Sequence, residues 1–326
     1  MSEPRRVPVS ARRGRAARFT AAFSVLAGLA AYVTLHDVTG SMGAPRCVIG
    51  SGDGRYEFTP EQASNAATIA AVGSSRGLPE RAVTIALATA LQESALRNIE
   101  HGDRDSLGLF QQRPSQGWGT PEQILDPVYS STKFYEGLEK VPGYSRLPLT
   151  VAAQKVQRSG FPQAYAKHEP DATLLSAALT GRAQAALACT ADVAETEGRP
   201  GDPRRVRDEL VKAFGTRTAP EVETVPEQGA GAPGAGARGT AAGKEAVTGP
   251  AELSVPVHEA RGPRAERGWA LAQWAVARAD ELRIAEVAYG DRIWVANTSS
   301  GGWKPVRGDK GVRGTDGSSV RLTLAR

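Results

Sequence analysis

The feature that most constrains the fold is residues 79–112, which begin as an apolar helix carrying one acidic side chain near its end. Leu87, Leu91 and Ser94 recur about once per helical turn, and most positions between them are small, which predicts a buried helix. Glu93 interrupts this run, and its neighbours one and two turns back are alanine and threonine. Burial in such surroundings raises the pKa of a carboxyl group and keeps it protonated near neutral pH, as a general acid requires.

Glu93 also has a simpler interpretation as a solvated residue near a helix end. Arg97 lies four residues later, on the same helix face, and could pair with it. The segment that follows is rich in turn-forming residues and leads to a second block, S-L-G-L-F-Q-Q at residues 106–112. A small hairpin around residues 103–112 is the only strand signal that we identify between residues 58 and 195.

The two blocks, Q-E-S at residues 92–94 and S-L-G-L-F-Q-Q at residues 106–112, resemble the Glu-Ser and Gly-Leu-Met-Gln blocks of the lysozyme-like soluble lytic transglycosylases. The resemblance covers roughly residues 58–190. It implies a mainly α, lysozyme-like domain in which Glu93 is the sole catalytic acid and base, and in which the second block contacts the sugar. The substrate-binding residues expected on this basis are Ser94, Ser106, Gly108, Phe110, Gln111, Gln154 and Tyr165.

The chain departs from this family on the helix predicted over residues 149–156. The relatives have a Tyr-Asn pair at the cleft there, whereas this chain has two alanines followed by Gln154 and Lys155. Nearby residues that could replace the missing contact are Arg158, Ser159 and Phe161. Gln111 has an alternative interpretation as a loop residue that caps the backbone. Aromatic loop residues such as Trp118 and Tyr144 could stack on sugars or pack in the core.

Charge and hydropathy at the start of the chain predict membrane insertion. Residues 1–18 hold six arginines and one glutamate, which equals the formal net charge of +5, so the remainder of the chain is close to neutral. Residues 19–35 are uncharged and just long enough to cross a bilayer core of about 30 Å. We expect a single-pass anchor with a cytoplasmic N-terminus and extracellular domains; a cleaved signal peptide is the alternative. A basic tail of this kind indicates membrane topology and not nucleic-acid binding.

The chain contains only two cysteines, Cys47 and Cys189, which bracket the lysozyme-like segment. In an extracellular compartment we expect them to form a disulfide, and two free buried thiols are the alternative. Closing so long a loop is worth roughly 4–5 kcal/mol on the loop-entropy model.

Composition divides the rest of the chain. Residues 36–57 are expected to form a linker and residues 58–195 the lysozyme-like domain. Residues 196–252 hold a short helix from Asp202 to Phe214 and then a segment rich in Gly, Ala and Pro, which is typical of a disordered linker. Residues 253–326 are expected to form a small α+β domain.

This last segment has a helix pattern over residues 269–277 and strand patterns at residues 284–289, 292–296 and 320–324. It resembles the C-terminal domain of secreted actinobacterial wall proteins related to zinc D-Ala-D-Ala peptidases. Those relatives carry an Asp-His-x-His ligand group on the last strand, where this chain has S-S-V-R. With His258 as its single histidine, the segment is expected to be metal-free.

Three functions are possible, and the two enzymatic ones differ in the number of carboxylates that they need near the cleaved bond. A lytic transglycosylase needs one acid, because the 6-hydroxyl of the substrate is the nucleophile. A lysozyme-type muramidase would use Asp103 or Asp105 as a second carboxylate. A non-catalytic wall-binding protein is the third possibility. We favour a membrane-anchored peptidoglycan lytic transglycosylase that cleaves the MurNAc-GlcNAc β-1,4 bond. It would be a monomer without a cofactor, with peptidoglycan strands and, through residues 19–35, the cytoplasmic membrane as partners.

Overall fold

The computed structural model describes most of the chain from residue 45 onward. The described ranges are residues 45–50, 54–158, 162–191, 200–223, 251–258, 263–298, 302–306 and 315–326. The basic tail, the predicted anchor at residues 19–35, most of the linker predicted at residues 196–252, Ser159 and Phe161 lie outside these ranges. Among the described residues, no helix has both the length and the apolar character needed to cross a membrane.

The described residues from Pro45 onward belong to one compact unit. Its helices are α2 (Pro60–Ser75), α3 (Glu80–Ser94), α4 (Pro121–Ile124), α5 (Pro127–Glu139), α6 (Leu149–Gln157), α7 (Glu169–Leu179), α8 (Pro203–Phe214), α9 (Arg264–Ala277) and α10 (Ala279–Leu282), with 3₁₀ turns η2 (Pro114–Gln116), η3 (Tyr144–Arg146), η4 (Pro162–His168) and η6 (Thr216–Thr218). The strands are β1 (Cys47–Ile49), β2 (Tyr56–Phe58), β3 (Leu187–Cys189), β4 (Glu221–Glu223), β5 (Glu252–Pro256), β6 (Ile284–Tyr289), β7 (Arg292–Val295), β8 (Lys304–Pro305) and β9 (Ser319–Leu324). The prediction of a helical region followed by an α+β region is confirmed in this coarse form.

The helix starts follow from local capping chemistry. Thr59 accepts a hydrogen bond from the backbone N–H of Gln62, whose side chain bonds back to the Thr59 N–H, so a capping box opens α2. Thr120 and Gln123 repeat this arrangement at α4. The side chain of Asp126 accepts from the first turn of α5. In each case proline follows the cap, where its missing N–H does no harm.

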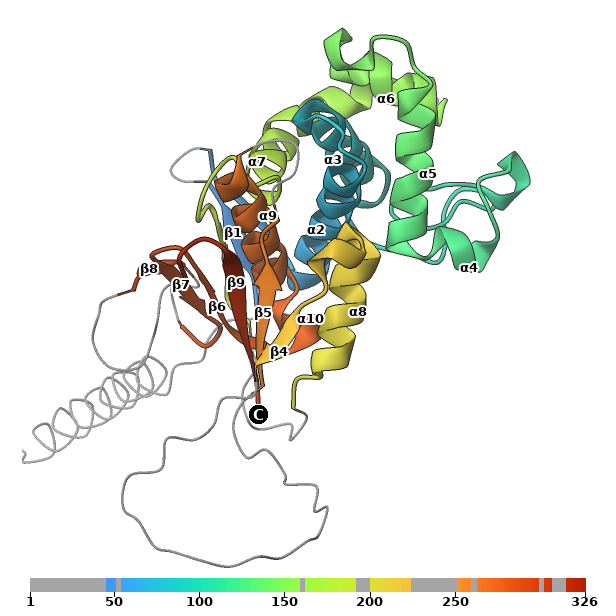
Figure 1. Cartoon of the computed structure of the whole chain (residues 1–326). Helices are drawn as coiled ribbons and strands as arrows, with labels where there is room; N and C mark the ends of the chain where they lie inside the picture. The colour runs from blue at the N-terminus through green and yellow to red at the C-terminus, as the bar shows by residue number, and fades with distance from the viewer. Residues whose placement is uncertain are drawn as a thin grey trace, which may run out of the picture. The chain divides into compact units, whose positions relative to one another are not determined.

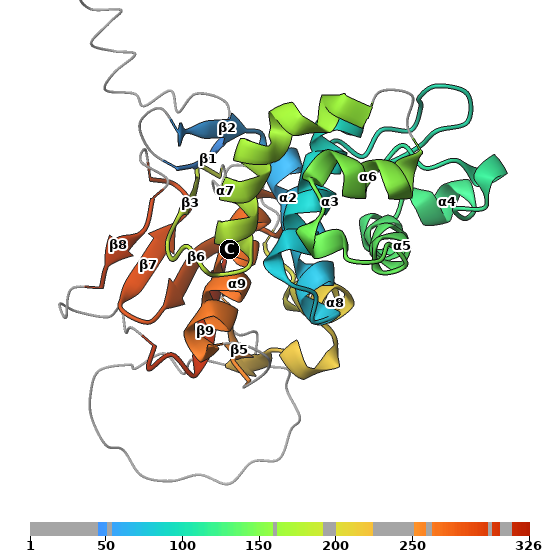
Figure 2. The same ribbon diagram turned by 90° about the horizontal axis from the view of Figure 1, so that it is seen from above.

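The helices pack around α3. This helix contacts α2, α5, α6 and α7, and its residues from Ala82 to Leu91 are all buried. The helix α2 lies beside α3, and α9 packs on the other side of α2 from α5 (Figures 1 and 2). The apolar run that dominates the sequence is therefore the central helix of the helical core.

Two antiparallel sheets complete the unit. A six-stranded sheet in the order β4-β5-β9-β6-β7-β8 packs on α9. The strands β6 and β7 form an antiparallel pair where the sequence has two neighbouring strand patterns, and a turn at Gly290, with φ of 58°, joins them. The strand β4 comes from residues that we expected to be linker, and pairs with β5 through Val222 opposite Leu253. Its residues carry no strong strand pattern, and they are ordered by backbone pairing at the sheet edge.

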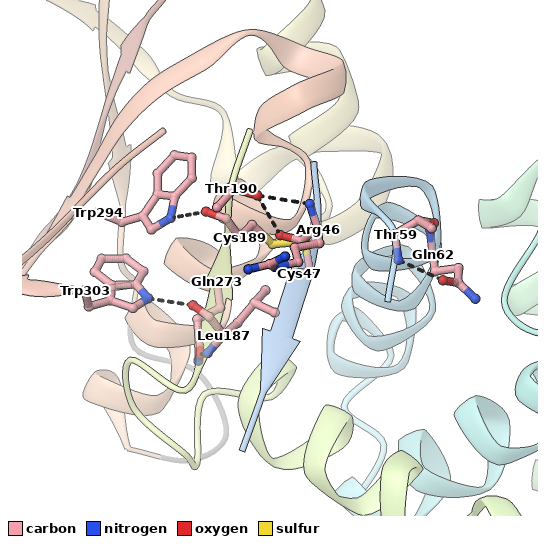
Figure 3. The surroundings of a disulfide bond; sticks show 10 residues. All are labelled: Arg46, Cys47, Thr59, Gln62, Leu187, Cys189, Thr190, Gln273, Trp294 and Trp303. Atoms are coloured by element: carbon pink, nitrogen blue, oxygen red, sulfur yellow. Dashed lines mark hydrogen bonds between the residues drawn. A yellow bond between two sulfur atoms is a disulfide. The ribbon is translucent and has the colours of Figure 1, made fainter. Parts of the chain in front are cut away.

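The smaller sheet, in the order β2-β1-β3, joins the two ends of the predicted lysozyme-like segment. Cys47 lies opposite Cys189 in the β1–β3 register, and the two sulfur atoms form the predicted disulfide, which is confirmed (Figure 3). This sheet also corrects the linker predicted at residues 36–57, because β1 and most of β2 fall within it.

The C-terminal segment contacts the helical core directly, which the composition of the intervening residues does not predict. Gln273 on α9 is fully buried, and its Oε1 accepts from the N–H groups of Ala186 and Leu187 at 2.9 Å. Its Nε2 donates to the carbonyls of Ala178 and Ala183 at 2.7 and 3.0 Å. One side chain thus satisfies four backbone groups between α7 and β3.

Two indole groups make further contacts to the same strand. Trp294 donates to the carbonyl of Cys189 and Trp303 to that of Leu187, each at 3.0 Å (Figure 3). The disulfide, β3 and the C-terminal sheet therefore form one connected substructure.

Candidate active site

Glu93 is held in place by the way α3 ends. The two residues directly after α3 are Ala95 and Leu96. Both adopt the left-handed backbone conformation, with φ of 53° and 59°, although neither is glycine. Such conformations cost of order 1–3 kcal/mol each and need support. The support comes from α2: Gln62 donates to the carbonyl of Ala95 and Asn65 to that of Leu96, both at 2.8 Å. Glu93 therefore sits on the last turn of a buried helix whose end is held by two side chains of α2.

The carboxyl group of Glu93 is half-buried and accepts hydrogen bonds from neutral side chains. Tyr165 Oη donates to Glu93 Oε1 at 2.6 Å, and the side chain of Gln157 also bonds to the carboxyl group. Burial raises the pKa of Glu93 above its ordinary value, and the two hydrogen bonds offset this only in part. Among the described residues, Glu93 has no salt bridge, and Arg97 donates instead to the carbonyl of Ser94.

The second block packs against the end of α3. Ser94 Oγ donates to the carbonyl of Leu109 at 2.8 Å, which ties the helix to the loop. Leu107 and Gln112 exchange backbone hydrogen bonds and form the small hairpin expected around residues 103–112. At Gly108, with φ of 72°, a Cβ atom would lie 2.8 Å from the carbonyl oxygen of Ile124, so this position requires glycine.

Glu93 lines a cleft of about 990 Å³. Its walls come from the loop at residues 103–118, the C-terminal end of α5 and the C-terminal end of α6. The lining residues are Glu93, Asp103, Arg104, Ser106, Gln111, Gln112, Arg113, Gln116, Trp118, Gly137, Lys140, Val141, Lys155, Val156, Gln157 and Arg158. A volume of this size suits an extended ligand larger than a single sugar.

The residues proposed from the sequence separate into two groups. Ser106 and Gln111 line the cleft together with Glu93. Ser94 and Phe110 are buried behind it, with the Phe110 ring stacked on Phe134 at 4.7 Å between centroids.

Gly108, Gln154 and Tyr165 are also absent from the lining. Gly108 shapes the turn, and Gln154 lies on α6 outside the cleft wall. Tyr165 is fully buried and reaches Glu93 from inside the protein. The side chain of Gln111 folds back on its own loop, where its Nε2 lies 3.3 Å from the carbonyl of Gly108.

Sequence reasoning missed Gln112 and Gln157. Gln112 is 2 % exposed; its Nε2 donates to the carbonyl of Ser130, and its buried Oε1 has no hydrogen-bond partner in the described part of the chain. Gln157 Nε2 donates to the carbonyl of Phe110 at 2.7 Å. A signal for Gln157 was present, because it lies four residues after buried Ala153 and so on the inner face of α6.

The two aspartates considered as second carboxylates differ in their surroundings. Asp103 lines the cleft. Asp105 is outside the lining and pairs with Arg113 at 2.6 Å, while it accepts from the backbone N–H of Ser115 at 2.8 Å. The hydrogen bonds from Ser115 and Arg113 hold the pKa of Asp105 well below its ordinary value. Asp103 is therefore the better placed of the two.

The residues around S-S-V-R at 318–321 begin strand β9. Over the described parts of the chain, no group of three or more His, Cys, Asp or Glu side chains is arranged to hold a metal ion.

Comparison with known proteins gives one family match, outside the cleft. A family model described as VldE, C-terminal domain, matches residues 205–315, from within α8 to the residues before β9. The match covers well under half of the chain and none of the residues around Glu93. No curated protein matches the chain with statistical significance.

Proposed function

We propose that the protein is a peptidoglycan lytic transglycosylase with Glu93 as its general acid and base. The observation that carries this proposal is the setting of Glu93, a half-buried carboxyl group at the end of the central helix that opens into a large cleft. Its raised pKa favours the protonated form that a general acid must have, and its hydrogen-bond partners are neutral.

The reaction needs one protein carboxyl group. Protonated Glu93 gives its proton to the glycosidic oxygen as the bond to C1 breaks. The resulting carboxylate then takes the proton of the substrate 6-hydroxyl, which attacks C1 and closes a 1,6-anhydro ring. Tyr165 and Gln157 would hold the carboxyl group in one orientation during both steps.

A muramidase is the second candidate, because Asp103 lines the same cleft. In that reaction Asp103 would act as nucleophile or would activate a water molecule. Asp105 is a poor choice for this role, since Arg113 and Ser115 occupy its oxygens.

Digestion of purified peptidoglycan by the full chain, with soluble products read by mass spectrometry, separates these functions. A transglycosylase releases 1,6-anhydromuramyl products, which are one water lighter than the reducing-end products of a muramidase. Asp103→Asn should leave the anhydro products and their rate nearly unchanged. Reducing-end products that disappear in Asp103→Asn would establish the muramidase, and binding to walls without any soluble product would contradict both enzymes.

We also propose that residues 19–35 anchor the protein in the cytoplasmic membrane and place the cleft outside the cell. The apolar run and the preceding arginines support this location, and the disulfide fits an oxidising compartment. Fractionation of cells into membrane and soluble parts would test it, since a cleaved signal peptide would leave the protein in the soluble fraction.

A further inference from the structure

Four cationic side chains at the cleft have no role in the proposed reaction. They are Arg104 from the loop, Lys140 at the end of α5, and Lys155 and Arg158 at the end of α6. We call these four residues the basic rim. All four are exposed, and among the described residues none of them forms a salt bridge. The remaining cation of the lining, Arg113, is paired with Asp105.

The charges of the cleft do not balance. Among the described residues that line the cleft, two unpaired carboxyl groups, Asp103 and Glu93, face the basic rim, and the raised pKa of Glu93 favours its neutral form. Positive charges that face one cleft from three segments attract an anionic ligand and raise its local concentration. A neutral glycan would gain nothing from them, since its hydroxyl and acetamido groups carry no charge.

We propose that the basic rim binds the carboxylates of the stem peptides, so that the cleft selects peptide-substituted strands over neutral glycan. This inference rests on the proposed function, because the muramyl residue at the cleaved bond is the sugar that carries the peptide. Its branch point therefore lies within the cleft, and the free carboxylates of the peptide extend toward the walls. Lys140 and Lys155 come from α5 and α6, so an anionic branch between them would meet cations on two sides.

Binding can be measured without cleavage in the full chain carrying Glu93→Gln. The probes are soluble peptide-substituted strands, the same strands with their carboxylates converted to amides, and a neutral chitooligosaccharide of similar length. We expect the first probe to bind most tightly, and its affinity to fall as salt rises from about 50 to 500 mM, because exposed ion pairs are screened over that range.

Charge removal at the rim should abolish this preference. In the double variant Lys140→Gln/Lys155→Gln, affinity for peptide-substituted strands should fall on the order of 10-fold, with little change for the amidated strands. The matched control is Lys304→Gln, at an exposed lysine on β8 that does not line the cleft. It should change neither the affinity for peptide-substituted strands nor the affinity for amidated strands. Equal affinity for charged and amidated strands, or no salt dependence, would overturn the inference. Cleavage of peptidoglycan by the parent chain would still support the proposed function even if the basic rim showed no preference for charged strands. Failure of the inference about the basic rim can therefore be distinguished from failure of the proposed function.

Discussion

The hydroxyl group of Tyr165 donates a 2.6 Å hydrogen bond to Oε1 of Glu93, across 72 residues of sequence. Tyr165 lies in the 3₁₀ turn η4, and its side chain is fully buried. The Tyr165 hydroxyl group therefore approaches Glu93 from the protein interior. Glu93 itself faces the cleft. This arrangement fixes one carboxyl oxygen and leaves the carboxyl group accessible to a ligand on the other side.

Replacing Tyr165 by phenylalanine should shift the pH dependence of lysis. The hydrogen bond stabilises the ionised carboxylate and lowers its pKa, so its loss should raise the pKa of Glu93 further. Activity that needs the protonated acid declines as pH rises through this pKa, so the alkaline limb of the profile should move to higher pH. The maximal rate should also fall, because the acid is less well oriented. A Tyr56→Phe control, remote from the cleft, should leave the profile in place; an unmoved alkaline limb in Tyr165→Phe would contradict the role of Tyr165.

The disulfide should contribute substantially to stability. Cys47 and Cys189 are 142 residues apart, and a loop of that length predicts roughly 4–5 kcal/mol of stabilisation through the unfolded chain. Reductant should therefore lower the Tm of the native protein. The Cys47→Ser/Cys189→Ser variant, which should start from a lower Tm, is the control and should not respond to reductant. Titration of two reactive thiols in the native oxidised protein would contradict the pairing.

Gln273 should be essential for the junction between α9 and the helical core. In Gln273→Leu the N–H groups of Ala186 and Leu187 and the carbonyl of Ala183 lose the partner that Gln273 provides, whereas the carbonyl of Ala178 still accepts from the N–H of Gly181. Each buried polar group left unpaired costs about 1–3 kcal/mol. We expect a loss of about 3 kcal/mol or more in the free energy of unfolding, measured by denaturant titration. Arg264→Gln at the exposed start of the same helix should cost under about 0.5 kcal/mol. Equal stability of the two variants would show that the junction contributes little.

Much of the helical architecture could be predicted because it depends on local chemistry. Thr59 and Asp126 each precede a proline and cap α2 and α5, which is a local pattern of neighbouring residues, and the buried face of α3 follows from its periodicity. The pairing of Cys47 with Cys189 was predictable because the chain has no other cysteine.

The parts that were missed depend on contacts distant in sequence. The strand β4 has little intrinsic strand character and exists through its pairing with β5. Gln273 reads as a polar position on a helix, and only the fold shows that it binds backbone groups of the α7–β3 connection. In the site, Tyr165 was expected to line the groove, but the direction of a side chain in a short 3₁₀ turn cannot be read from periodicity.

The central claim, that Glu93 is the acid and base of a lytic enzyme, is tested most directly by comparing the rates at which Glu93→Gln and the parent chain release soluble products from peptidoglycan. The amide keeps the shape of the side chain but cannot give up the proton, so the rate should fall by about 10²- to 10⁴-fold or more. Circular dichroism and Tm should remain close to those of the parent, and Glu100→Gln, at an exposed position outside the cleft, should retain full activity. Digestion by Glu93→Gln at the rate of the parent chain would contradict the account.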